Sequence, residues 1–252
     1  MLRVIIIVFA LMLATSSYAC AGQELIVSAA ASLKDAFGKV AAGFEAENPG
    51  VKVVLNTAAS GALLRQIQSG APADVFASAD RETMEAAIKG NAVIASSSAV
   101  FATNRLVMIV PAGSKSAISS LSGLLSVKVK RVTIGKPDYV PAGKYAKDAL
   151  AGARIWEQVE PKLIYADSVR QALDYVSRGE VDAGFVYATD AMTAGWKVAT
   201  ALQINTVEPV MYKAGVVTGS KNDAVARKFI GYLGGAKGQA ILSAYGFGKA
   251  KP

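Results

Sequence analysis

The chain has 252 residues, of which 52% are hydrophobic, and a formal net charge of +8 from 27 basic and 19 acidic residues. It contains no histidine, which removes the commonest general base, the usual catalytic triads and most zinc sites. A single cysteine excludes an intramolecular disulfide, so an apolar core must hold the fold. The basic residues are scattered, with the densest group at Lys128, Lys130 and Arg131, which suits small anionic partners rather than nucleic acid.

No enzyme motif accompanies this composition. The sequence lacks a G-x-S-x-G nucleophile elbow, a P-loop pattern and a G-x-G-x-x-G motif that opens a helix after a strand. Paired carboxylates remain an alternative, since Asp74, Asp80, Asp182 and Asp190 are present. We expect these acids to cap helices or to lie in loops, so the sequence favours a binding protein over an enzyme.

The first 21 residues have the pattern of a secretory signal peptide. Arg3 precedes an apolar run over residues 4–13, and a small, polar stretch ends at Ala19-Cys20-Ala21. The run is about half of the roughly 20 residues that a membrane-spanning helix needs. We therefore expect cleavage after residue 21 and a soluble periplasmic protein. A lipid-anchored Cys20 is the alternative, but Ser17 stands where lipoprotein signals usually have leucine.

Beyond the signal, short apolar runs alternate with helical patterns, which predicts an α/β fold with parallel or mixed sheets. Strands are expected at 25–28, 51–55, 74–77, 106–110, 132–134, 163–165, 184–187 and 211–217. Helices are expected between the first strands and near 117–125, 143–150, 168–178, 224–233 and 236–245. In the first helix, the apolar residues at helical spacing are Leu33, Ala36, Phe37, Val40, Ala41 and Phe44. Ser32 and Asp35 at its start have the spacing of a capping box.

The sequence shows no internal repeat and no low-complexity linker, although 231 residues suffice for two lobes of about 100 residues each. We expect the lobe boundary to lie in extended crossovers near 101–104 and 205–210. The first lobe would then be discontinuous, with residues 22–102 and 211–252, and residues 103–210 would form the second.

Four junctions between a strand and a helix carry small and hydroxylic residues. They lie at 30–33, 59–61, 141–143 and 167–169. Each is expected to present backbone N–H groups at the positive end of a helix, which is a site for an anion, and a serine hydroxyl adds another donor. Such a site could enclose an oxyanion without lysine or arginine. A serine at this position can also serve only as a helix cap.

Six segments together resemble one family of transport proteins. They are 29–33 (AAASL), 59–66 (ASGALLRQ), 69–80 (SGAPADVFASAD), 140–147 (VPAGKYAK), 185–187 (FVY) and 238–247 (GQAILSAYGF). These segments are similar to the periplasmic molybdate-binding proteins of ABC transporters. They occur in the same order and extend over nearly the whole chain after the signal peptide. The resemblance implies a two-lobed type II periplasmic binding protein fold, with each lobe a mixed sheet flanked by helices and the ligand in the cleft between them.

The resemblance also implies a ligand, a partner and a site. The ligand would be molybdate or tungstate, the partner a membrane permease, and the protein a monomer with no cofactor and no metal coordinated by side chains. The implied oxyanion contacts are Ser32 and Ser60 from one lobe, and Ala142, Val169 and Tyr187 from the other. Sulfate or phosphate as the ligand remains an alternative.

Four residues at or near these positions have an alternative role or depart from the family pattern. Tyr187 could instead be a core aromatic residue at a strand end. Gly61 departs from a common family pattern, which has a further serine there, with little expected effect. Arg65 and Arg170 are expected on helix faces in surface ion pairs, outside the site.

Overall fold

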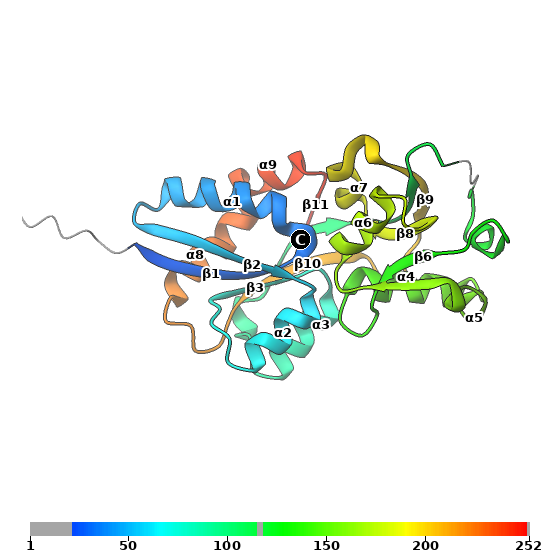
Figure 1. Cartoon of the computed structure of the whole chain (residues 1–252). Helices are drawn as coiled ribbons and strands as arrows, with labels where there is room; N and C mark the ends of the chain where they lie inside the picture. The colour runs from blue at the N-terminus through cyan, green and yellow to red at the C-terminus, as the bar shows by residue number, and fades with distance from the viewer. Residues whose placement is uncertain (1–21, 115–117, 251–252) are drawn as a thin grey trace, which may run out of the picture.

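The structure, a computed structural model, describes residues 22–114 and 118–250, so the expected signal peptide at 1–21 lies outside the described residues. Two sheets form the framework (Figure 1). In the order β11-β4-β10-β3-β1-β2, the six-stranded sheet consists of Gly248–Lys249, Ala99–Asn104, Val210–Val216, Val75–Ser78, Gln23–Ala30 and Val51–Ala58. In the order β7-β6-β8-β5-β9, the five-stranded sheet consists of Leu163–Ala166, Val132–Gly135, Ala183–Tyr187, Leu106–Pro111 and Val198–Ile204.

Helices flank both sheets, and each sheet with its helices forms one lobe. The first lobe carries α1 (Lys34–Glu47), α2 (Ser60–Gln68), α3 (Arg81–Lys89), α8 (Asp223–Gly234) and α9 (Ala236–Ala244). The second carries α4 (Pro141–Gly152), α5 (Trp156–Val159), α6 (Val169–Ser177) and α7 (Ala188–Ala194). In Figure 1, α1, α8 and α9 lie on one side of the first sheet and α2 and α3 on the other. Short 3-10 helices occur at Ala31–Leu33 (η1), Ala95–Ser97 (η2), Leu121–Leu125 (η3), Glu160–Lys162 (η4) and Gly195–Lys197 (η5).

Both sheets are mixed, as the alternation of strands and helices predicts. The pairs β1–β2, β1–β3, β6–β7 and β6–β8 are parallel, whereas β10 and β5 each pair antiparallel with both neighbours. Parallel strands need a crossover, and the intervening helices supply it. The carboxyl ends of β1, β2, β6 and β7 lead into the segments that hold Ser32, Ser60, Ala142 and Val169, and β8 ends at Tyr187.

The chain passes between the sheets twice. It leaves the first sheet after β4 and enters β5 at residue 106, and it returns after β9, which ends at residue 204, into β10. The segment at 101–104, expected as a crossover, is part of strand β4 and pairs with β10 as far as Asn104 opposite Val210.

Helix α1 shows how the sequence positions the first site segment. Its buried face consists of Ala36, Phe37, Val40, Ala41 and Phe44, as the helical spacing predicts. This face packs on α8, where the ring of Phe229 lies 5.2 Å from that of Phe44 in an edge-to-face arrangement. The packing fixes the start of α1, and therefore the 3-10 turn η1 immediately before it, against the end of β1.

The structure corrects one expectation about secondary structure and adds elements that were not expected. The helix expected near 117–125 is only the 3-10 turn η3 over its described residues, because Ser120, Ser122 and Gly123 favour turns over a regular helix. Strand β9 and helix α7 had no clear signal in the sequence. No helix within 22–114 and 118–250 has the length and apolar character needed to cross a membrane.

Candidate functional site

Ser32 lies at the centre of η1 and is only 2% exposed. The capping box expected with Asp35 is wrong, because the 3-10 turn makes Leu33 the N-cap of α1 and neither side chain caps the helix. Instead, the Ser32 hydroxyl lies 2.9 Å from the hydroxyl of Tyr212 on β10, and the Asp35 carboxylate pairs with Arg170 at 2.7 Å. Ser32 is therefore held by the far end of the chain rather than by its own helix.

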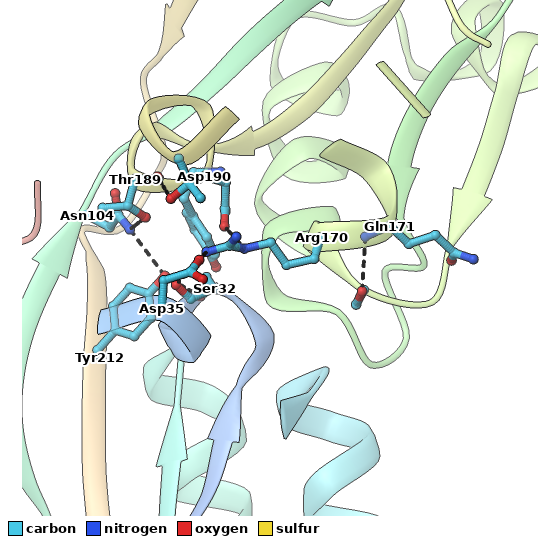
Figure 2. Close-up of polar contacts among 11 residues, drawn as sticks. Ser32, Asp35, Asn104, Arg170, Gln171, Thr189, Asp190 and Tyr212 are labelled. Carbon is cyan, nitrogen blue, oxygen red and sulfur yellow. Dashed lines mark hydrogen bonds and ion pairs between the residues drawn. The ribbon is translucent and has the colours of Figure 1, made fainter. Parts of the chain in front are cut away.

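Hydrogen bonds link Ser32 to Tyr212 and Tyr212 to Asn104 (Figure 2). The Arg105 N–H donates to Asn104 Oδ1 at 2.9 Å, which fixes the orientation of the Asn104 amide. Asn104 Nδ2 then donates to the Tyr212 hydroxyl oxygen at 3.2 Å. Either hydroxyl can donate in the Ser32–Tyr212 hydrogen bond, and when Tyr212 donates, the proton of Ser32 is free for another acceptor.

Ser60 is the first residue of α2 and is fully buried. Ala59, not Ser60, is the N-cap, and no side chain caps this helix. The Ser60 hydroxyl accepts a hydrogen bond from the Ala79 N–H at 3.1 Å. An oxygen that accepts from a backbone N–H still has its own proton to donate. Ser60 is thus oriented as a donor.

Ala142 and Val169 lie in the first turns of α4 and α6. Ala142 follows Pro141, which opens α4, and Val169 is the first residue of α6. Backbone N–H groups at these positions have no acceptor within their own helix and lie at its positive end. The neighbouring Ser168 is a true N-cap, since its hydroxyl accepts from the Gln171 N–H at 3.2 Å.

Tyr187 ends β8 and is 1% exposed. Its hydroxyl donates to the Ala79 carbonyl at 3.4 Å, and its ring packs edge-to-face on Tyr212 at 5.7 Å. Burial raises the pKa of Tyr187 well above its ordinary value, so the hydroxyl stays protonated and remains a donor at neutral pH.

Hydrogen bonds and ring packing connect Ser32, Ser60 and Tyr187 across the two lobes, and Val169 lies next to a residue that contacts Ser32. Ser60 and Tyr187 both bond to Ala79, and Ser32 bonds to Tyr212, on which Tyr187 packs. Val169 is followed by Arg170, whose Nη2 donates to the Ser32 carbonyl at 3.4 Å. Within the described residues, no hydrogen bond joins Ala142 to the other four, and its position follows from α4, which packs on β6 and β8.

Gly61 has a structural role that the sequence did not indicate. Its N–H donates to the Tyr139 carbonyl of the other lobe at 3.0 Å. A Cβ atom on residue 61 would lie 2.8 Å from Tyr139 Cα, which is too close for an ordinary contact. The absence of a side chain at this position therefore allows the two lobes to approach closely.

The two arginines outside the predicted site differ from expectation. The guanidinium of Arg65 lies over the Tyr139 ring, 4.8 Å from its centre, rather than in an ion pair that the structure describes. The surface pair expected for Arg170 is wrong: its side chain is only 20% exposed and contacts the fully buried Asp190 at 2.7 Å. The N-terminus of α6 faces the first lobe, so its second residue points into the lobe interface instead of into water.

Sequence reasoning also missed Tyr212 and Asn104, and it expected Asp190 only as a helix cap or loop residue; Asp190 does accept from the Tyr187 N–H at the start of α7, and it also pairs with Arg170. Tyr212 lies inside a strand whose apolar pattern indicated only core residues, and Asn104 was placed in a crossover. Among the described residues, no group of three or more cysteine, aspartate or glutamate side chains could hold a metal ion. The arrangement offers neutral hydroxyl and amide donors, which can enclose an anion.

Comparisons with known proteins identify the family. The model for the family "Bacterial extracellular solute-binding protein" matches residues 25–248. The chain is 38% identical to the molybdate-binding protein ModA of Escherichia coli, over 93% of this chain and 95% of that protein. It is 35% identical to ModA of Haemophilus influenzae, over 90% and 91%. The periplasmic molybdate-binding protein of Azotobacter vinelandii has the same fold, with a TM-score of 0.81, 24% identity and coverage of 90% of this chain and 100% of that chain. The chain belongs to the bacterial extracellular solute-binding proteins and has their two-lobed type II fold.

Proposed function

We propose that this chain captures molybdate, and also tungstate, outside the cytoplasm and delivers it to the permease of an ABC transporter. The observation that carries the proposal is the hydrogen bond from the Ala79 N–H to Ser60, which leaves the proton of a fully buried hydroxyl free for an anion. The buried Ser32 hydroxyl, which pairs with the Tyr212 hydroxyl, supplies a second such donor when Tyr212 donates in that pair. The names of the relatives that cover almost the whole chain support molybdate as that anion.

The proposed site encloses the oxyanion with seven neutral donor groups from five residues. They are the hydroxyls and backbone amides of Ser32 and Ser60, the amides of Ala142 and Val169, and the Tyr187 hydroxyl. All five residues are at most 4% exposed, as expected of a site that closes around a dehydrated ligand. An oxyanion that still carries a proton, such as phosphate at neutral pH, needs an acceptor in addition, and none of the five provides a carboxylate.

Several parts of this proposal go beyond the family assignment. The lobe boundaries remain a prediction. Residues 22–102 and 211–252 are expected to move together as one lobe, and residues 103–210 as the other. We further propose that the protein acts as a monomer without a cofactor, catalyses no reaction and reaches the periplasm through a signal peptide cleaved after residue 21. Its membership of a family of extracellular binding proteins supports the location.

Calorimetric titration of residues 22–252 with molybdate, tungstate, sulfate and phosphate tests the function. We expect micromolar or tighter affinity for molybdate and tungstate and at least a hundredfold weaker binding of sulfate, about 2.7 kcal/mol in free energy. Rigidly held donors fit an oxyanion of one radius only. A smaller anion misaligns one or two hydrogen bonds to its charged oxygens, and that loss accounts for the expected difference in binding free energy. Equal affinities for sulfate and molybdate would contradict the assignment.

A further inference from the structure

A cluster of charged side chains joins the two lobes beside the proposed site (Figure 2). Arg170, the second residue of α6, places Nη2 2.7 Å from Asp35 Oδ2 on α1. Its Nε lies 2.7 Å from Asp190 Oδ1 on α7. Asp35 belongs to the first lobe, whereas Arg170 and Asp190 belong to the second. We refer to these three residues as the interlobe ion-pair cluster.

Within this cluster, Asp190 holds Arg170 in place. Asp190 is fully buried, and its other carboxylate oxygen accepts from the Tyr187 N–H at 3.2 Å. A buried carboxylate that loses its only cationic partner is left uncompensated, which is strongly unfavourable. The Arg170–Asp190 pair lies entirely in the second lobe, so opening of the lobes leaves it intact. The Asp35 carboxylate, which is 38% exposed, is the partner that Arg170 meets across the interface.

Arg170 also connects two segments of the proposed site. It follows Val169 directly in α6, and its Nη2 donates to the carbonyl of Ser32 at 3.4 Å. Both Val169 and Ser32 are predicted to contact the oxyanion. The single positive charge of Arg170 already faces two carboxylates, so it is poorly suited to bind the anion directly. Its contacts instead hold the η1 turn of one lobe against the α6 N-terminus of the other.

We propose that Arg170 is a positioning residue that couples oxyanion capture to lobe closure. Asp190 fixes the guanidinium in the second lobe, and the guanidinium then binds Asp35 and the Ser32 carbonyl of the first lobe as the lobes enclose the ligand. The inference rests on the proposed function, since it assumes that Ser32 and Val169 share one oxyanion. It adds a residue that lies outside the ring of direct donors.

The variant Asp35→Asn tests the coupling without disturbing the buried pair. It removes the charge that Arg170 meets across the interface, at a position that is partly exposed, so the fold should survive. We expect three- to tenfold weaker binding of molybdate, mainly through faster dissociation, and an unchanged melting temperature without ligand. The matched control is Arg178→Ala, at the end of the same helix, whose pair with Glu180 at 3.9 Å lies within the second lobe. It should bind like wild type.

A second set of variants addresses Arg170 itself. Arg170→Met should weaken molybdate binding more than Asp35→Asn does, but it also leaves Asp190 without its cation. The double variant Arg170→Met/Asp190→Asn removes that complication. Adding Asp35→Asn to the double variant should weaken binding no further, because the partner of Asp35 is already gone. Full additivity of the two effects would overturn the proposal.

Lobe closure can be measured directly, because residues 22–252 contain no cysteine. Fluorescent labels on Lys39→Cys in α1 and Asp174→Cys in α6, both exposed, report the distance between the lobes. Asp35→Asn should need three- to tenfold more molybdate for half closure. Closure at the wild-type concentration with wild-type dissociation would overturn the proposal.

A wild type that neither binds molybdate nor closes with it would instead refute the proposed function. The ion-pair cluster is then tested by the ligand-free distance distribution. Asp35→Asn should shift this distribution to longer distances than in wild type, and identical distributions would overturn the positioning role of Arg170.

Discussion

Ser60 and Tyr187 reach the same residue from opposite lobes. The Ser60 hydroxyl accepts from the Ala79 N–H at 3.1 Å, and the Tyr187 hydroxyl donates to the Ala79 carbonyl at 3.4 Å. The first bond leaves the Ser60 proton available, whereas the second engages the Tyr187 proton in a long contact that a charged oxygen can replace. The two hydroxyls should therefore contribute differently to the ligand-free fold and to binding.

Ser60→Ala should weaken molybdate binding roughly ten- to a hundredfold. It removes one hydroxyl donor to a charged oxygen, a loss on the order of 1.5 to 3 kcal/mol. The Ala79 N–H also loses its acceptor, so the melting temperature should fall slightly. Calorimetric affinity beside the ligand-free melting temperature measures both effects, and Ser97→Ala, which likewise removes a hydroxyl acceptor from a backbone N–H (that of Val216, at 2.8 Å), serves as the control for stability alone. Wild-type affinity in Ser60→Ala would place Ser60 outside the site.

Tyr187→Phe should weaken molybdate binding to a similar extent while leaving the ligand-free melting temperature almost unchanged. Phenylalanine keeps the edge-to-face packing on Tyr212 at 5.7 Å, and only the long hydrogen bond to Ala79 is lost. If Tyr187 is merely a core aromatic residue at a strand end, the opposite pattern follows: a lower melting temperature and unchanged affinity. The same two measurements distinguish these outcomes.

Gly61→Ala should obstruct lobe closure. The added Cβ would lie 2.8 Å from Tyr139 Cα, so the closed arrangement must shift the backbone of the other lobe. We expect at least a tenfold loss of molybdate affinity, with a ligand-free melting temperature that is unchanged or raised, because alanine favours a helix over glycine by roughly 1 kcal/mol. Gly38→Ala in α1, where a Cβ meets nothing within 4 Å, is the matched control and should leave affinity unchanged. Equal affinity in both variants would contradict a role for Gly61 in closure.

Asp190 should make the stability of the protein depend on pH. Burial raises the pKa of Asp190 from 3.8 to about 6, partly offset by Arg170 and the Tyr187 N–H and reinforced by Asp35. The folded protein thus keeps this proton to a higher pH than the unfolded chain does. The stabilisation from the proton is fully present below pH about 4 and is lost as pH rises through about 6, in total about 3 kcal/mol.

Denaturant unfolding of wild type and Asp190→Asn between pH 4 and 7 measures this contribution. The free energy of unfolding of wild type should fall relative to the variant by about 3 kcal/mol as pH rises across this range. The ion pair with Arg170 forms only when Asp190 is ionised, so its effect is already included in the pKa of Asp190 and in this difference. Parallel curves would show that Asp190 has an ordinary pKa.

The sequence alone determined the architecture and the positions of the predicted donors. Apolar spacing predicted the buried face of α1, from Ala36 to Phe44, because each of these residues must cover the same sheet. The junctions at Ser32, Ser60, Ala142 and Val169 were found because small and hydroxylic residues at the end of a strand mark the start of a helix. These signals are local, so they survive without knowledge of the fold.

Only the tertiary structure decided how these residues are used. The hydroxyl of Ser32 is oriented by Tyr212, 180 positions away in the chain, and the Ser32 carbonyl is reached by Arg170, 138 positions away. No periodicity encodes such pairs, since their hydrogen bonds form when β10 and α6 come together beside η1. Arg170 therefore had the sequence pattern of a surface residue on a helix, although packing of the two lobes places it against a buried carboxylate. Burial and hydrogen-bond direction are properties of the assembled lobes, and they distinguish a helix cap from a donor to an anion.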